Sequence, residues 1–324
     1  MLVLLLYAAG MGESLAQTQV ATLQHGDSIS VFYGANAFVD AHTAAESGDI
    51  ITLSSGSFTV PSEVTKAITL RGAGATVDTV ASTNPTIFGG TIYLNVADTT
   101  NFLTIEGILF TNGVYYKTLN NPKFIRCNFT EIDYYSGLMQ NAQFVNCIIN
   151  DFDFYYAKNT ILINSVVWNP DDIYNNSPVV LYNSIMKVAD YHSSLSAYNS
   201  IIVRTSNSYP GSSCSFINCI GINTYSSGSP FGSGFTTGCT TYSSYEDVFE
   251  SFTGEFSMEE KFILKDEIAT GFLGEDGTQV GIYGGFMPYS NRPSYMVLKR
   301  CNVASQSTID GKLSVEIEVV NEGE

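Results

Sequence analysis

The segment Phe144-Val145-Asn146-Cys147 decides the fold, because variants of it recur along the middle of the chain. The pattern is an apolar residue, any residue, an Asn, and then a small Cys or Ser. It returns as FIRC at 124–127, LINS at 162–165, LYNS at 181–184, AYNS at 197–200, FINC at 216–219 and, weakly, TTGC at 236–239, and Ile105-Glu106-Gly107-Ile108 fits the same register. The small residues are separated by 20, 20, 18, 19, 16, 19 and 20 positions, namely Gly107, Cys127, Cys147, Ser165, Ser184, Ser200, Cys219 and Cys239. Such regular spacing indicates a repeat architecture.

A repeat of this length favours coils of short strands over pairs of helices. The segments between the motifs are rich in Val, Ile, Phe, Tyr and Thr, and are punctuated by Asn, Gly, Ser and Asp, which is typical of short strands and turns. Strands of about 3 residues, at roughly 3.3 Å per residue, would close one small coil. Stacked coils would pair each strand in parallel with its copy in the next coil. A leucine-rich repeat needs a recurring Leu-x-x-Leu-x-Leu frame, which this chain lacks. We therefore predict an all-β solenoid.

Two further segments resemble the right-handed parallel β-helix proteins of the pectin-lyase-like superfamily. A short amphipathic stretch, 38–46, precedes SGDIITL at 47–53, GSFT at 56–59 and AITLRGAG at 67–74. In that superfamily a capping helix leads into first coils of this pattern. The segment GEDGTQVGIYGG at 274–285 resembles the last coil of secreted Gram-negative members. The resemblance implies a right-handed parallel β-helix over residues 17–286, with ten to twelve coils and an N-terminal cap. Alternating residues at 313–319 (LSVEIEV) suggest a C-terminal β extension within 287–324.

The N-terminus and the charge balance concern location and partners. Residues 2–9 (LVLLLYAA) form a short apolar run and Ser14-Leu15-Ala16 precede Gln17, so we expect residues 1–16 to be a signal peptide, with a buried first strand as the alternative. We expect a secreted, periplasmic or cell-surface protein of Gram-negative type, with no membrane insertion of the mature chain. With 14 basic and 31 acidic residues the net charge is −17, which argues against nucleic acid and anionic membranes as partners.

The recurring Asn and small residues have structural interpretations. Asn tolerates positive φ, so we expect a ladder of stacked amides at one turn, made of Asn146, Asn164, Asn183, Asn199 and Asn218. Cys127 and Cys147 occupy one repeat position in neighbouring coils, as do Cys219 and Cys239. Stacking would allow disulfides, but buried free thiols that pack as small apolar groups are favoured. The chain has no CxxC and no Cys/His cluster, so zinc is not expected.

One face of the predicted solenoid carries chemistry. Six positions beyond the small residue, four successive coils have an Asp, with a Tyr two or three positions further on in most of them. We define this Asp/Tyr face by Asp133, Asp153, Asp171, Asp190, Tyr115, Tyr135, Tyr155 and Tyr174. Coils about 4.8 Å apart match the length of one sugar unit, and tyrosine rings bind the C–H faces of sugars. Carboxylates accept hydrogen bonds from hydroxyls. The alternative is that Asp residues cap turns and the rings fill the core.

These residues leave several functions open. The leading hypothesis is non-catalytic binding of a polysaccharide or surface glycan that is neutral or amine-bearing. The alternatives are a glycoside hydrolase that uses two of the four Asp, and a purely structural or adhesive rod. No catalytic residue is assigned, since the NTD, GHG and RIK motifs of polygalacturonases are absent and only Asp171-Asp172 matches the set. The one cofactor that this chemistry suggests is Ca²⁺, held by Asp133 and Asp153, because closely stacked carboxylates repel unless a cation intervenes.

Overall fold

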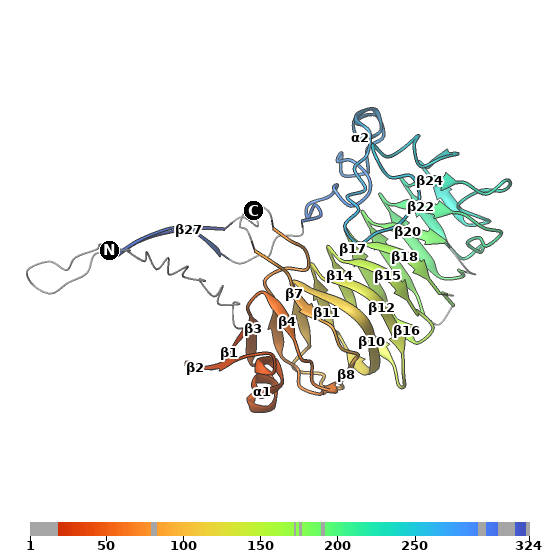
Figure 1. The fold of residues 1–324 in the computed structure, drawn as a ribbon. Helices are drawn as coiled ribbons and strands as arrows, with labels where there is room; N and C mark the ends of the chain where they lie inside the picture. Colours follow the sequence, from red (N-terminus) through yellow and green to blue (C-terminus); the bar gives the residue numbers. More distant parts are fainter. Residues whose placement is uncertain are drawn as a thin grey trace, which may run out of the picture.

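The computed structural model is nearly all β and forms a parallel β-solenoid of about 10 turns (Figure 1). It describes residues 19–78, 83–171, 173–174, 177–188 and 192–290, and the backbone of two further strands, Met296–Val303 and Val315–Asn321. The predicted fold class is therefore confirmed. The predicted signal peptide and Asp190 lie outside the described residues.

Two sheets run the length of the stack, and each coil contributes strands to both. The first sheet pairs in parallel β3 (Ile50–Leu53), β6 (Thr69–Arg71), β9 (Thr104–Glu106), β11 (Lys123–Ile125), β14 (Gln143–Val145), β17 (Thr160–Ile163), β19 (Val179–Tyr182), β21 (Leu195–Tyr198), β23 (Ser215–Ile217) and β25 (Phe235–Thr237). The second sheet pairs β4 (Gly56–Phe58), β7 (Thr86–Phe88), β10 (Ile108–Asn120), β12 (Asn128–Tyr134), β15 (Ile148–Phe152), β18 (Val166–Pro170), β20 (Ile185–Val188), β22 (Ile201–Arg204), β24 (Ile220–Asn223) and β26 (Thr240–Tyr242). Short strands extend its edge where coils are longer: β5 (Glu63–Val64), β8 (Ile92–Val96), β13 (Met139–Gln140) and β16 (Ala157–Lys158).

The N-terminal end of the stack is capped, as the sequence predicts. The strands β1 (Val20–His25) and β2 (Ser28–Tyr33) form an antiparallel hairpin, and β1 also pairs antiparallel with β3. The helix α1 (Ala37–Ala44) contacts both hairpin strands and β3. Its Phe38 is fully buried and stacks on Phe88 of the coils at 4.9 Å between ring centroids. The cap thus covers the apolar interior of the first coil.

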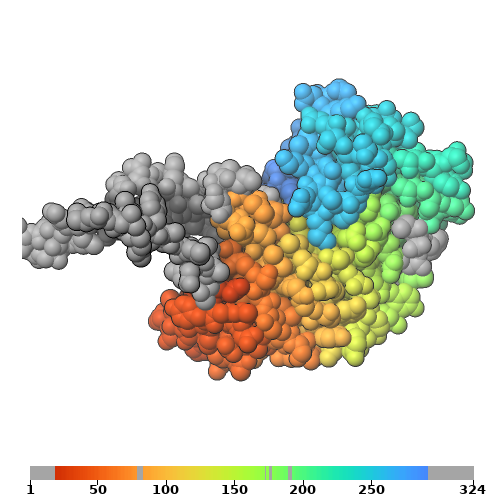
Figure 2. All heavy atoms as spheres, in the orientation of Figure 1, coloured from red at the N-terminus to blue at the C-terminus, as the bar shows by residue number. Residues whose placement is uncertain are grey.

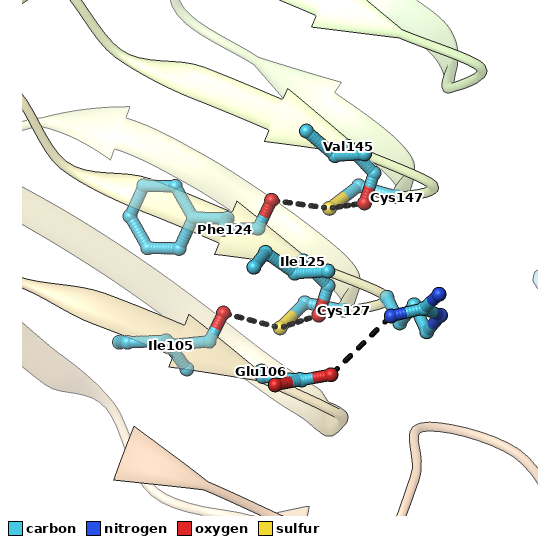
Figure 3. Close-up of polar contacts among 8 residues, drawn as sticks. Ile105, Glu106, Phe124, Ile125, Cys127, Val145 and Cys147 are labelled. Atoms are coloured by element: carbon cyan, nitrogen blue, oxygen red, sulfur yellow. Dashed lines mark hydrogen bonds and ion pairs between the residues drawn. The ribbon is translucent and has the colours of Figure 1, made fainter. Parts of the chain in front are cut away.

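The corner between the two sheets explains the repeated motif. The five recurring Asn residues all have φ between 47° and 55°, which is the left-handed conformation that the sequence predicts for them. The residue after each of these Asn is a small Cys or Ser, because its side chain is enclosed between coils and hydrogen-bonds to backbone groups. Ser165 Oγ accepts from the amide of Cys147 at 3.0 Å and donates to the carbonyl of Ile163 at 2.9 Å. Figure 3 shows Cys127 and Cys147 one above the other, each with its thiol bonded to backbone carbonyls.

Gly107 belongs to another column of the repeat than the one predicted for it. Phe124 pairs with Ile105 and Ile125 with Glu106, so Gly107 is the counterpart of Arg126, and Ile108 that of Cys127. Gly107 and Arg126 have φ of 67° and 51°, and both occupy the left-handed position. Glycine adopts this conformation without the cost that a Cβ imposes, which is why a Gly stands there. Sequence alignment had placed Gly107 in the column of small residues.

Aromatic stacks fill the interior. Phe110 stacks on Phe129 at 4.7 Å, and Phe124 stacks on Phe144 at 4.8 Å. These distances match the roughly 4.8 Å between hydrogen-bonded strands, so equivalent rings of neighbouring coils meet face to face. The repeat therefore sets both backbone pairing and core packing.

A C-terminal layer covers the outer surface of the second sheet. The coils end at β26, earlier than the predicted boundary of 286, and residues 243–290, with α2 (Asp266–Gly271), run back over the stack (Figure 2). Outward side chains of β15 to β24 pack under this layer, namely Ile148, Val166, Trp168, Ile185, Ile201, Val203, Ile220 and Ile222. Asn164 Nδ2 donates to the carbonyls of Ile282 and Gly284 at 2.8 and 2.7 Å. The segment 274–285 is thus a strap across the Asn corner rather than a last coil. Beyond it, β27 (Met296–Val303) and β28 (Val315–Asn321) pair in antiparallel orientation, in the region where a C-terminal β extension is predicted.

Candidate glycan-binding face

The predicted Asp residues stack at one edge of the second sheet. Ile132 of β12 pairs with Phe152 of β15, so Asp133 and Asp153, the next residues, lie in neighbouring coils. Phe152 in turn pairs with Pro170 of β18, which brings Asp171 beside Asp153. Three of the four predicted carboxylates therefore lie in a row.

The predicted Tyr residues do not form one column. Tyr115 pairs with Asp133, so it continues the Asp row instead of flanking it, and Tyr93 of the preceding coil pairs with Tyr115. Tyr135 and Tyr155 are 56% and 45% exposed, and Tyr174 meets Tyr155 edge to face at 5.1 Å. The face thus combines a row of Tyr93, Tyr115, Asp133, Asp153 and Asp171 with exposed rings beside it.

Other tyrosines of this edge belong to the core, as the turn-and-core alternative anticipated. Tyr116 is fully buried, and its hydroxyl donates to the carbonyl of Asp153 at 3.1 Å. Tyr134 and Tyr156 are half-buried and stack at 4.0 Å. These inner rings support the outer ones from beneath, since Tyr155 contacts Tyr156 at 4.6 Å. The exposed rings are therefore held in place before any ligand arrives.

An aromatic and cationic cluster at the N-terminal end of the face was not predicted. Tyr93 and Tyr135 meet edge to face at 4.9 Å, and Lys117 Nζ lies 5.4 Å from both ring centroids. Lys117 also pairs with Glu63 at 3.2 Å. The repeat motif does not reach the two neighbouring coils that carry Glu63 and Tyr93, so sequence spacing gave no signal for this cluster.

The carboxylates interact electrically and also cap turns. Burial, followed by the charges of Asp133 and Asp171, raises the pKa of Asp153 to about 6, and its side chain lies within hydrogen-bond reach of Asp133. Asp153 Oδ1 accepts from the amide of Tyr155 at 2.7 Å, which partly opposes the rise in pKa. Asp133 Oδ1 likewise accepts from the amide of Tyr134 at 2.6 Å. Each carboxylate uses one oxygen for its own turn and retains further acceptor capacity.

A second polar row lies beside the first. Glu131 pairs with Asp151, and Asp151 pairs with Asn169. Burial and the charges of Asp133 and Asp151 raise the pKa of Glu131. Lys187 Nζ donates to Asn169 Oδ1 at 2.8 Å and lies 5.2 Å from the ring centroid of Trp168. The face therefore offers carboxylates, amides, an ammonium group and rings together.

The suggested metal site gains no additional ligands. Over the described ranges, no group of three His, Cys, Asp or Glu side chains converges as metal ligands would. Asp133 and Asp153 alone provide fewer oxygens than the six to eight that Ca²⁺ takes.

The predicted ladder of Asn side chains is wrong, because the hydrogen bonds of Asn164 and Asn199 go to the C-terminal strap and not to the Asn of the next coil. Asn199 Oδ1 accepts from the amide of Glu275 at 3.0 Å, and Asn164 bonds to the same strap, so this column anchors the C-terminal layer. A true amide ladder lies at another corner, which the sequence reasoning missed. There Asn141 Nδ2 donates to Asn121 Oδ1 at 2.9 Å, and Asn159 Nδ2 donates to Asn141 Oδ1 at 3.1 Å. All three have φ of 51–55°, and their spacing of 20 and 18 residues could have revealed them.

The cysteines are free thiols, as the favoured interpretation holds. The five described ones form no disulfide, and four of them are buried, namely Cys127, Cys147, Cys214 and Cys219. Burial raises the pKa of Cys147 to about 12. Cys239 in the last coil is half-buried, and a hydrogen bond from the Cys219 thiol is the main cause that lowers its pKa to about 7.

Comparisons with known proteins assign no family to this chain, so the chain is classified by its fold. No protein-family model matches the sequence, and no curated protein matches it significantly. In the part of the chain that the structure describes, no helix is long and apolar enough to cross a bilayer. The chain is a parallel β-solenoid with a capped N-terminal end and a C-terminal covering layer.

Proposed function

We propose that this protein is a secreted or cell-surface β-helix of pectin-lyase-like type that binds neutral or amine-bearing glycans along the Asp/Tyr face. The observation that carries the proposal is the exposure of Tyr135 and Tyr155, at 56% and 45%, beside the stacked Asp133, Asp153 and Asp171. Exposed tyrosine rings present an apolar face that a ligand can cover and a hydroxyl that can hydrogen-bond to it. A polysaccharide provides C–H faces for the rings and hydroxyl donors for the carboxylates.

The negative charge of the Asp/Tyr face restricts the kinds of glycan that it can bind. The whole chain carries −17, and the row contains three described carboxylates in neighbouring coils. A polyuronate would be repelled by this field. A neutral chain would avoid that repulsion, and an amine-bearing one would lower the mutual repulsion of the carboxylates. A membrane-inserted or nucleic-acid-bound role gains no support from these residues.

Glycoside hydrolysis is the second candidate, because Asp153 has the raised pKa of a general acid. Retaining enzymes hold two carboxyl groups about 5–5.5 Å apart and inverting enzymes about 6.5–9.5 Å apart. Asp133 and Asp171 lie two coils apart, at roughly 4.8 Å per coil, so their spacing is close to the inverting range. We place binding ahead of hydrolysis because Asp133 and Asp153 each use a carboxylate oxygen to accept a hydrogen bond from the backbone of their own turn. Product release from a polysaccharide panel between about pH 4 and 8 would reverse this order.

A glycan array tests the proposal. We expect the wild-type protein to retain a neutral or amine-bearing glycan, and the double variant Asp153→Ala/Tyr155→Ala to lose it. Tyr182→Ala is the matched control, since Tyr182 is 42% exposed but lies on the first sheet. Retention by the double variant would leave a structural or adhesive rod as the better description.

A further inference from the structure

A hollow of about 740 Å³ lies at the C-terminal end of the same edge of the second sheet. The loop after β24 and the turn after β26 form its two sides. Tyr225 lines it, four residues beyond Gly221, just as Asp171 stands four residues beyond Val167. Val167 and Gly221 lie in one row of paired residues that passes through β20 and β22. Tyr225 thus lies at the same edge of the sheet, three coils further on, roughly 14 Å along the stack.

The loop side of the hollow is fixed by a buried arginine. Arg204 is 4% exposed, and its Nη1 donates to the carbonyl of Ser227 at 2.7 Å. Its guanidinium lies 5.2 Å from the ring centroid of Tyr225 and supports that ring. Gly228 has φ of 87°, and a Cβ there would collide with the guanidinium group of Arg204. The loop therefore holds the position of Tyr225 in advance, which lowers the entropy cost of binding.

The other side of the hollow supplies an acceptor and a second ring. Asp247 Oδ2 accepts from the amide of Ser244 at 3.2 Å and from Ser243 Oγ at 3.3 Å. Its Oδ1 makes no hydrogen bond within the described part of the chain and remains an acceptor for a ligand hydroxyl. Tyr242 contributes its ring and packs against the apolar layer. Among the described residues that line the hollow, none is Lys, Arg or His.

We propose that this hollow holds the terminal sugar unit of a glycan whose following units lie along the Asp/Tyr face; this inference rests on the proposed function. Its volume falls in the range of roughly 300–1,000 Å³ that small-ligand sites occupy. Two tyrosines, one carboxylate and several hydroxyls, without a base, suit a neutral or amine-bearing sugar and not a uronic acid. The face would then bind the side of the chain, and the hollow its end. A site of this kind recognises chain ends, whereas the open face alone does not.

Chain-end recognition has a measurable signature. The probes are cello-oligosaccharides and chitosan oligosaccharides, from dimers to polymer, titrated by calorimetry. An end site predicts that affinity per chain rises until the chain spans hollow and face and is constant for longer chains. A face without an end site predicts affinity per chain that grows with the number of sugar units.

A blocking variant separates the two sites. Thr241 is exposed and lines the hollow, so Thr241→Trp should fill it while Arg204 and Asp247 are not substituted. The matched control is Thr237→Trp, at an exposed position in β25 outside the hollow. We expect Thr241→Trp to lose about tenfold or more in affinity for oligosaccharides, and the control to bind as wild type. Unchanged binding by Thr241→Trp, together with affinity that grows with chain length, would overturn the end site and leave the proposed function intact. No binding of either series to the wild type, with an empty glycan array, would instead refute the proposed function.

Discussion

Asp153→Asn tests the electrostatics of the face, because the fold makes the charge on Asp153 costly. Its pKa is raised to about 6, against about 3.9 in an unfolded chain. Two pKa units correspond to about 3 kcal/mol, and solvent screening of a half-buried group leaves about 1–3 kcal/mol. A raised carboxyl pKa means that the folded state binds the proton more tightly. The stability it contributes is complete below about pH 4 and is lost as the pH rises through about 6.

The Asn variant keeps the turn and removes the charge. Its amide oxygen still accepts from the amide of Tyr155, which lies 2.7 Å from Oδ1 in the wild type. We therefore expect equal stability of the two proteins near pH 4 and a gain of about 1–3 kcal/mol for the variant near pH 8. For a chain of this size that is a rise in Tm of about 2–6 °C by circular dichroism. The pKa of His42 is lowered to about 4 by burial and by Lys66 in both proteins, so its titration cancels in the difference. An equal gain at both pH values, or none near pH 8, would refute the reasoning.

Three further predictions concern the thiols, the corner and the covering layer. Iodoacetamide near pH 8 should modify Cys239 first among the described cysteines, because its pKa is lowered to about 7 and its side chain is half-exposed, as peptide mass mapping would report; early labelling of Cys127 would contradict the packing. Ser165→Ala should cost about 1–3 kcal/mol in urea unfolding, since it leaves buried backbone groups without a partner, whereas Ser165→Cys should retain most of the stability. Phe252→Ala should cost about 3–5 kcal/mol and shift the emission of Trp168, whose ring centroid lies 5.1 Å from that of Phe252; unchanged emission would mean that the layer does not pack as described.

The sequence predicted the coils well, because most of the central repeats contain the short motif that forms the corner of a coil. An Asn followed by Cys or Ser specifies a left-handed corner and an enclosed polar side chain, and the chain repeats this at 146, 164, 183, 199 and 218. The covering layer was missed because it has no repeat. A signal for it was nonetheless present. Strand β18 reads Val-Val-Trp and is apolar on both faces, which indicates a strand that is buried on both sides.

The sequence predicted the positions of the Asp residues of the site better than those of its Tyr residues. The Asp spacing follows the coil period, so three carboxylates fall in register. Tyr115 does not, because an irregularity between Phe110 and Gly113 shifts the pairing of β10 with β12. The hollow beside Tyr225 depends on a loop that Arg204 holds through hydrogen bonds to the carbonyls of Ser227 and Ser229. These residues are more than 20 positions apart in the sequence, so no local sequence pattern predicts the contact.

The most direct measurement is an equilibrium titration of the tightest array glycan against three proteins. These are the wild type, Tyr135→Ala/Tyr155→Ala and the control Tyr182→Ala, whose exposed ring lies on the first sheet. If the Asp/Tyr face binds glycans, the double variant should lose about tenfold or more in affinity and the control should match the wild type. Equal affinities in all three proteins would contradict the account.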